Sequence, residues 1–548
     1  MSGRKVEVTK LPSMYGRRLV SGTKPVYTEV MSLLRNIATV GGITMISRVL
    51  GFVRDILVAA VLGAGLLADV FFVAFKLPNL FRRLFAEGAF SAAFVPQFAG
   101  YLESHGTEVA RVFAEQVLTV LLWALLGFVI VLELAMPWVM LGFAPGFARS
   151  PEQFDLAVLL TRITFPYLLF ISLVSLLAGG LNSLGRFAAA AATPIILNLC
   201  LIGSILWLVR FTPTPAHALA WGVAAAGMVQ FCWLFVHILR AGIHLRLPFP
   251  RITRSVYIML TRIVPVAIGA GVYQISLLID TMIASLLPAG SISYLFFADR
   301  VNQLPMGVVG VAVGTALLPL LSRQVRAGDE VGARYSQNRA LEFSLFLALP
   351  AAVALVVIAG PVVTVLFERG AFTAKDAAAT AGALAIYATG LPAYVLVKGL
   401  TPGFFAREDT VTPVKIGLLA VAVNLVLNVI LMGPLLHIGI AAATSVSAWL
   451  NAALLIMVLH RRGHFAVDAG FKSRVPRMAI ASALLGAALL VSQVQMEPLL
   501  AGVLTERILG LAGLVIVGLV VYGILALVMR IATVDDLRRV LNRQPASA

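Results

Sequence analysis

Long apolar runs dominate this chain and decide what it can fold into. Apolar residues make up 60% of the 548 residues and charged residues only 12%, whereas soluble globular chains carry about 25% charged residues. A helix that crosses a bilayer needs about 20 consecutive apolar residues. Runs of this kind predict about fourteen transmembrane helices, near residues 36–62, 67–100, 116–143, 155–182, 188–210, 216–240, 256–287, 291–322, 340–367, 377–405, 412–434, 437–460, 474–495 and 505–530. The runs are continuous and do not alternate over about ten residues, which excludes a β-barrel. We therefore predict an all-α, polytopic membrane protein.

The basic residues between the runs predict how the helices are oriented. If the amino terminus is cytoplasmic, most of the 42 lysines and arginines fall in segments on that side, and the other side holds only Arg149, Arg210, Arg369, Lys375 and Arg507. The positive-inside rule then places both termini in the cytoplasm. The net charge of +17 reports this topology and contact with anionic membrane lipids, and we predict no nucleic-acid partner.

An internal repeat divides the chain into two similar halves. Residues 55–65 align without gaps on residues 280–290, and a Phe-Phe pair follows each segment at the same spacing. An even number of helices per half keeps the halves in the same orientation, so we predict two six-helix lobes related by a parallel pseudo-two-fold axis along the membrane normal. The predicted parts are a basic cytoplasmic tail (1–32), an N-terminal lobe (33–242), a C-terminal lobe (243–464), two further helices (465–532) and a second cytoplasmic tail (533–548).

The segment 47–96 carries too many charges for a passive membrane anchor. Its charged residues are Arg48, Arg54, Asp55, Asp69, Lys76, Arg82, Arg83 and Glu87. Each arginine or lysine at the centre of a spanning helix costs roughly 2.5–3.5 kcal/mol, so these side chains must face protein or water. Because the excess is basic, the segment predicts a polar cavity that receives an anion.

Three motifs carry a resemblance to a known family. Residues 47–55 (SRVLGFVRD), 69–91 (DVFFVAFKLPNLFRRLFAEGAFS) and 298–300 (ADR) resemble the MurJ (MviN) family of bacterial lipid II flippases, within the MOP superfamily of exporters. The resemblance runs from about residue 33 to residue 530. It implies a transporter of the cytoplasmic (inner) membrane, and not an enzyme, that moves the undecaprenyl-pyrophosphate-linked peptidoglycan precursor to the outer leaflet. A complete two-lobed transporter also implies a functional monomer, with membrane lipids as its other partners.

The resemblance further implies which residues bind the substrate. The cavity arginines of the family fall on Arg48, Arg54, Arg82 and Arg300, and its polar residues in the first two helices fall on Asp69, Asn79 and Glu87. Guanidinium groups suit a pyrophosphate because they bind its oxygens in forked geometry and stay charged. Pro78 lacks an amide hydrogen, so we also predict a kink near Asn79 that frees a backbone carbonyl.

A cation site is implied by the same resemblance. Some members of the family hold a sodium ion at positions that match Asp280, Asn424, Asn428 and Thr444. Asn428 departs from that pattern, which has a carboxylate there, and the loss of a negative charge weakens a sodium site. Coupling to Na⁺, to H⁺ or to the membrane potential alone stays open, and no other cofactor is expected.

Several charged residues have simpler interpretations. Arg83 and Glu87 have the i,i+4 spacing of a pair on one helix face. Asp55 is interpretable as a counter-ion or as a helix-packing residue, and Lys398 as a side chain that snorkels from a helix end toward water.

Two other function classes, a membrane enzyme and another exporter, are alternatives to the flippase. A membrane enzyme acting on a polyprenyl phosphate would need clustered carboxylates for Mg²⁺ or a positioned base, and the sequence carries neither. The alternative is another MOP-superfamily exporter, either a polysaccharide-lipid flippase or a drug/cation antiporter. An antiporter of cationic drugs should have an acidic cavity, whereas the cavity predicted for this chain is basic.

Overall fold

Helices joined by short turns make up the protein. The computed structural model describes residues 26–83 and 90–531. The first half contains α1 (Val26–Leu62), α2 (Leu66–Phe81), α3 (Ser91–Leu134), α4 (Met136–Phe143), η2 (Pro145–Arg149), α5 (Pro151–Thr164), α6 (Tyr167–Ser183), α7 (Phe187–Ala191), α8 (Thr193–Leu206), η3 (Leu208–Phe211) and α9 (Pro215–Arg240). The second half contains α10 (Arg254–Ser285), α11 (Ser291–Arg326), α12 (Glu330–Val357), α13 (Ala359–Phe367), α14 (Ala374–Phe405), α15 (Val411–Arg461), α16 (Ala469–Gln495), α17 (Glu497–Leu500) and α18 (Leu504–Val528).

The described parts of the predicted spans fall on these helices, with breaks where the chain carries proline. Pro166 separates α5 from α6, and α15 holds two predicted spans joined at Leu436, whose φ is 50°. By length and composition, nine helices within 26–83 and 90–531 can cross a membrane. The prediction of an all-α, polytopic membrane protein is therefore confirmed, while the count of fourteen spans stays a prediction.

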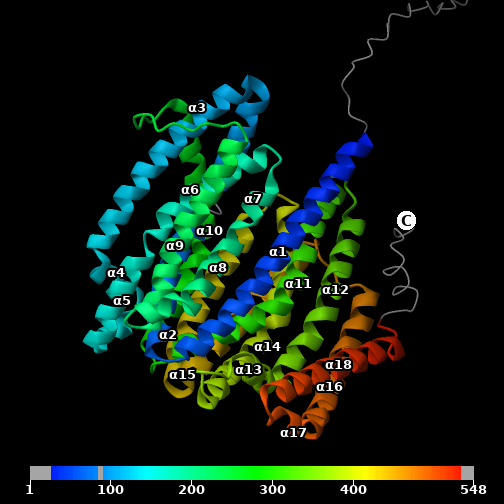
Figure 1. Cartoon of the computed structure of the whole chain (residues 1–548). Coiled ribbons are helices and arrows are strands. Elements are labelled where there is room, and N and C mark those ends of the chain that lie inside the picture. Colours follow the sequence, from blue (N-terminus) through cyan, green and yellow to red (C-terminus); the bar gives the residue numbers. More distant parts are fainter. Residues whose placement is uncertain (1–25, 84–89, 532–548) are drawn as a thin grey trace, which may run out of the picture.

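The helices pack into two groups with a pair of helices at one side. In the first group α6 packs on α3 and α9, and α8 packs on α9 and α1; in the second, α14 packs on α11, α12 and α15. The last long helices, α16 and α18, pack on each other, and α16 covers α12 (Figure 1). Helix α10 contacts α3 of the first group as well as α15 of the second, so it links the two groups along its length.

Pro78 frees a backbone carbonyl in α2, as predicted, while the kink near Asn79 stays a prediction. A proline cannot donate to the carbonyl four residues before it, which here is Ala74. The hydroxyl of Thr164 on α5 donates to the Ala74 oxygen at 2.8 Å. The freed carbonyl is thereby satisfied inside the protein, as a polar group at membrane depth must be.

Close backbone contacts join the two groups at one end of the molecule. The amide of Ala371 donates to the carbonyl of Ala60 at 2.7 Å. A Cβ on Gly370, whose φ is +60°, would lie 2.2 Å from the same carbonyl oxygen, and a Cβ on Gly146 would lie 1.9 Å from the Ser285 oxygen. Glycine is required at these positions because any side chain would hold the two groups apart. The positive-inside pattern predicts that this end faces the outside of the cell.

Cysteine labelling tests that orientation. In a chain whose Cys200 and Cys232 are replaced by serine, we expect a membrane-impermeant maleimide to label Gly65→Cys and Ala289→Cys in intact cells. Ala327→Cys and Arg461→Cys should react only after the membrane is opened, because the basic segments that hold them stay in the cytoplasm. The reverse pattern would invert the proposed direction of transport.

Candidate functional site

Asp55 lies between two arginines that come from different halves of the chain. Arg54, next to it on α1, donates to Asp55 Oδ1 from Nε at 3.0 Å and from Nη2 at 2.6 Å. Arg300 on α11 places its Nε 3.4 Å from Asp55 Oδ2. The Arg54 and Asp55 side chains are only 10% and 6% exposed, and that of Arg300 is 33% exposed. This geometry supports the interpretation of Asp55 as a counter-ion. Two cations share one carboxylate, so one positive charge is left uncompensated within the trio.

Neighbouring side chains fix the positions of both arginines. Arg54 Nη1 donates to Asn198 Oδ1 on α8 at 2.9 Å, and Asn198 Nδ2 donates to the Ser47 carbonyl at 2.9 Å. The Arg300 guanidinium lies over the Phe296 ring, 4.7 Å from its centroid, and Phe296 stacks on Phe72 of α2 at 3.9 Å. Asn198 carries no motif and was not predicted as a site residue, although an amide inside an apolar span is itself a signal of a buried polar contact.

Arg48 also reaches from α1 to the second half of the chain. Its Nη1 lies 2.7 Å from the position that a Cβ on Gly307 of α11 would occupy, so the guanidinium rests against the backbone there. Lys398 on α14 interacts electrostatically with Arg48. Lys398 is exposed, which is compatible with the interpretation as a snorkelling side chain, and that interpretation stays a prediction.

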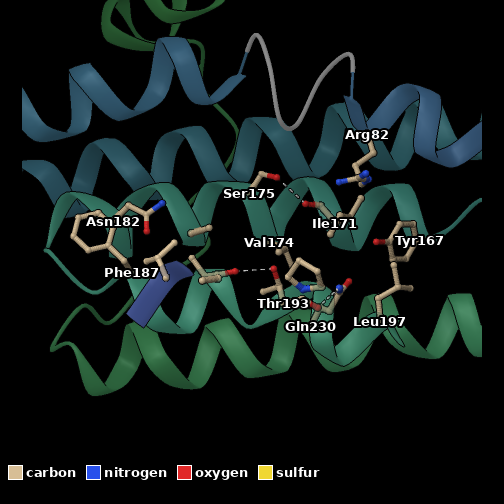
Figure 2. A pocket seen from close by; sticks show the side chains of 15 residues that line it. Arg82, Tyr167, Ile171, Val174, Ser175, Asn182, Phe187, Thr193, Leu197 and Gln230 are labelled. Carbon is tan, nitrogen blue, oxygen red and sulfur yellow. Dashed lines mark hydrogen bonds between the residues drawn. The ribbon is translucent and has the colours of Figure 1, made fainter. Parts of the chain in front are cut away.

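Arg82 contacts the end of α2 and a cavity in the first group of helices. It follows α2, and its Nε donates to Asn79 Oδ1 at 3.0 Å, while Asn79 Nδ2 donates to the Phe75 carbonyl at 3.0 Å. The Arg82 side chain reaches a cavity of about 510 Å³ within the first group of helices, here called the N-lobe cavity (Figure 2). Its other polar lining residues are Tyr167, Ser175, Asn182, Thr193 and Gln230. Leu197 of α8 lines the same cavity as Arg82. The next residue of α8, Asn198, contacts Arg54.

Asp69 holds the two halves together at their closed end. Its carboxylate accepts hydrogen bonds from the Gly290 amide at 2.6 Å and from the Ser293 amide and hydroxyl at 2.8 and 2.5 Å. These groups belong to the first turn of α11, where a carboxylate stabilises the unpaired amides and the helix dipole. Asp69 is 2% exposed. These contacts assign Asp69 to the closure of this end and not to the arginine site. Glu87, the other predicted acidic site residue, lies outside the described residues.

The predicted cation-site residues lie together as a hydrogen-bonded chain. Asn428 Nδ2 donates to Asp280 Oδ1 at 2.9 Å and to Asn424 Oδ1 at 3.0 Å. Asn424 Nδ2 lies 3.4 Å from Thr444 Oγ1, which donates to the Ile440 carbonyl at 2.8 Å. Asp280 Oδ1, Asn424 Oδ1 and Thr444 Oγ1 each accept an amide hydrogen, whereas the buried Asn428 Oδ1 has no partner.

A positive side chain already accompanies the only carboxylate of this chain of contacts. Lys76 on α2 interacts electrostatically with Asp280 and with Asp299 of α11. A sodium site needs several oxygens and profits from negative charge. Asp280, Asn424, Asn428 and Thr444 thus offer sodium a single carboxylate with a lysine nearby, and sodium binding at these residues stays a prediction.

Together, the fold and the site define a two-part helical membrane transporter with a basic site between its halves. Residues 58–527 match the family model described as lipid II flippase MurJ. The chain is 46% identical to the probable lipid II flippase MurJ of Rhizobium tropici over 94% of its own length and 98% of that protein.

Solved structures agree with this match. A lipid II flippase MurJ in an inward closed conformation superposes with a TM-score of 0.75 at 25% identity, over 89% of this chain and 97% of that one. An inward-facing multidrug-resistance MATE transporter of the MOP superfamily shares the fold, with a TM-score of 0.62 at 13% identity over 78% of this chain and 97% of that one. The protein belongs to the MurJ family of lipid II flippases.

Removal of the Asp69 carboxylate should loosen the closed end. Charge-assisted hydrogen bonds contribute about 1.5–3 kcal/mol each, so we expect Asp69→Ala to shift the population toward separated halves at least tenfold. The measurement is the labelling rate of Ser291→Cys from outside the cell, which should rise because Ser291 is only 3% exposed while this end is closed. Asp155→Ala, an exposed carboxylate on α5, is the matched control and should leave the rate unchanged; equal rates in both variants would contradict the closure role.

Proposed function

We propose that this protein moves lipid II from the inner to the outer leaflet of the bacterial cytoplasmic membrane by alternating access. Membership of the MurJ family supports the substrate class. The observation that carries the proposal is the Arg54–Asp55–Arg300 trio, which spans both halves of the chain and has a net positive charge. A pyrophosphate offers several acceptor oxygens to such forked donors.

The geometry suggests how the headgroup enters. The outer end is closed by Asp69 and by the Ala60–Ala371 backbone contact, so substrate reaches the arginines from the cytoplasmic side. The Arg300–Asp55 pair, at 3.4 Å, is looser than the Arg54–Asp55 pair. The incoming pyrophosphate therefore competes with Asp55 for Arg300, while Arg54 keeps its hold on Asp55 and Asn198. Substrate binding thereby alters a contact between the halves.

Ligand binding drives such a cycle only where the two states bind the ligand differently. In the closed state Arg300 is shared with Asp55 and Phe296 of its own helix. Substrate that draws Arg48, Arg54 and Arg300 together favours contact between α1 and α11 near the cytoplasmic side. That contact opposes the closure around Asp69, so the headgroup is released outside. Because both halves lie in one chain, a monomer is sufficient to form the transport pathway. Both of its termini lie in the cytoplasm.

We also propose that the Asp280 cluster works without sodium. Lys76 supplies positive charge close to Asp280, and the Asn428 amide bridges the oxygens of Asp280 and Asn424. The return step then depends on H⁺ or on the membrane potential, which acts on every charge that crosses the bilayer.

Complementation tests the function directly. A strain depleted of its own lipid II flippase should grow, and should expose lipid II on its outer leaflet, when this protein is expressed. If the protein is inserted in the membrane yet restores neither growth nor exposure, it transports another lipid-linked cargo of the same superfamily.

Single alanine substitutions of the cavity arginines should cripple export. Arg48→Ala, Arg54→Ala, Arg82→Ala and Arg300→Ala each remove a permanent charge whose contact is worth about 1.5–3 kcal/mol, or roughly ten- to a hundredfold in binding. Lysine at these positions should rescue only partly, because it keeps the charge and loses the planar fork. Arg461→Ala, on an exposed cytoplasmic segment, is the control. Full export by the alanine variants at normal membrane levels would exclude the arginine site.

Sodium dependence should appear when the carboxylate pattern is restored. We expect Asn428→Asp to gain sodium stabilisation, raising its melting temperature by roughly 2–4 °C in NaCl relative to KCl, because a second carboxylate replaces the bridging amide. The wild-type protein should melt at the same temperature in both salts. If the wild-type protein instead melts at a higher temperature in NaCl than in KCl, the amides rearrange around the ion and the cluster does bind sodium.

A further inference from the structure

We propose that the linker between the two groups of helices, residues 241–253, docks on anionic phospholipids of the cytoplasmic leaflet and anchors the first group at the membrane surface. The linker joins α9 to α10 without helix or strand. Helix α10 runs from the linker to Ser285 at the closed end, so the linker lies at the opposite end of the molecule. The positive-inside pattern predicts that this end is cytoplasmic. This surface is separate from the arginine site, and its occupant is independent of the transported cargo.

The linker exposes three large apolar side chains that lie close together in the sequence. Phe249 is 80% exposed, more than any other large apolar side chain in the described part of the chain, and Leu247 and Ile252 are 63% and 69% exposed. On a transmembrane helix such exposure is ordinary, since lipid chains cover the helix. The linker lies outside the helices, so its apolar side chains need a cover of their own to leave water.

Hydrogen bonds to α3 hold the linker at the height of the membrane surface. The Arg246 amide donates to Glu115 Oε1 at 2.9 Å, and the Thr253 hydroxyl donates to Gln116 Oε1 at 2.8 Å. The apolar run of α3 that is predicted to cross the bilayer begins at residue 116. In Figure 1 the linker runs beside the upper end of α3. Residues on both sides of Phe249 are thus fixed at the predicted membrane boundary.

The backbone of the linker suits this interfacial position. Backbone groups without partners are unfavourable in hydrocarbon and must stay near water or headgroups. Pro248 and Pro250, which flank Phe249, have no amide hydrogen to satisfy. The Phe249 ring can therefore reach the boundary of the acyl chains while the backbone stays among the headgroups, as in amphipathic segments that lie on a membrane.

The charge of the linker selects the lipid. Residues 240–254 contain no aspartate or glutamate. The exposed arginines in or beside the linker are Arg240, Arg246, Arg251 and Arg254. Glu115, which the linker contacts, is buried and paired with Arg111, so it does not cancel these charges. Each arginine near an anionic membrane surface contributes about fivefold in affinity. An anionic phospholipid matches both the arginines and the apolar side chains, whereas a nucleic acid matches the arginines alone.

A fluorophore at position 249 tests the docking. Phe249→Cys, in the full chain whose Cys200 and Cys232 are replaced by serine, is labelled with nitrobenzoxadiazole. The chain is placed in nanodiscs of phosphatidylcholine, or of equal parts of phosphatidylcholine and phosphatidylglycerol, with a nitroxide near the headgroup end of some acyl chains. The nitroxide quenches a fluorophore that enters the membrane surface. We expect the quenching to be severalfold stronger in the anionic nanodiscs, and to weaken at high salt.

Charge variants separate the linker from the rest of the basic surface. In the labelled chain, glutamine replaces three arginines in or beside the linker: Arg246→Gln, Arg251→Gln and Arg254→Gln. The matched control removes three exposed charges elsewhere at the same end: Arg323→Gln, Arg461→Gln and Lys472→Gln. We expect the linker variant to lose the extra quenching in anionic nanodiscs and the control variant to keep it. Elution of each variant as a single species reports that it is folded.

Equal quenching in neutral and anionic nanodiscs, or an equal loss in the linker and control variants, would overturn the proposal, because the linker would then not select anionic lipid. A label that stays unquenched in both nanodiscs would also overturn it, and would indicate that the linker faces water or another protein.

Discussion

The ion trio around Asp55 joins the electrostatics of this protein to its architecture. Arg54 and Asp55 are buried, where an unpaired charge is strongly unfavourable, and Arg300 is partly buried beside them. Arg54 and Arg300 are tolerated because they share the Asp55 carboxylate, and because Asn198 and the Phe296 ring hold them on their remaining sides. The trio also ties α1 to α11. A site that draws an anion and a contact that holds two halves together are therefore formed by the same three side chains.

Closure at the end around Asp69 uses a different kind of interaction. There the backbones of the two halves touch directly at Ala60 and Ala371, and Gly370 and Gly146 leave room for this approach. Asp69 adds a charged cap to the first turn of α11 without joining the arginines. The contacts at this end can separate while each helix keeps its own hydrogen bonds. The outer closure and the arginine site are thus able to respond in opposite directions to one ligand, as alternating access requires.

The sequence predicts the helical membrane fold well, because long apolar runs leave few alternatives. It also predicts the freed carbonyl near Pro78 and the proximity of Asp280, Asn424, Asn428 and Thr444. It does not predict which polar residues meet across the halves. Asn198 and Lys398 carry no motif, and only the packing of α8 on α1 and of α14 on α11 brings them to Arg54 and Arg48. Charge alone likewise groups Asp69 with the arginines, although its contacts place it at the closed end.

A structure of the complex with lipid II tests the central claim most directly. The account predicts pyrophosphate oxygens within hydrogen-bond distance of Arg300 and Arg54, with the Asp55–Arg300 distance longer than the present 3.4 Å. A pyrophosphate bound elsewhere, with the Arg54–Asp55–Arg300 trio intact, would contradict it.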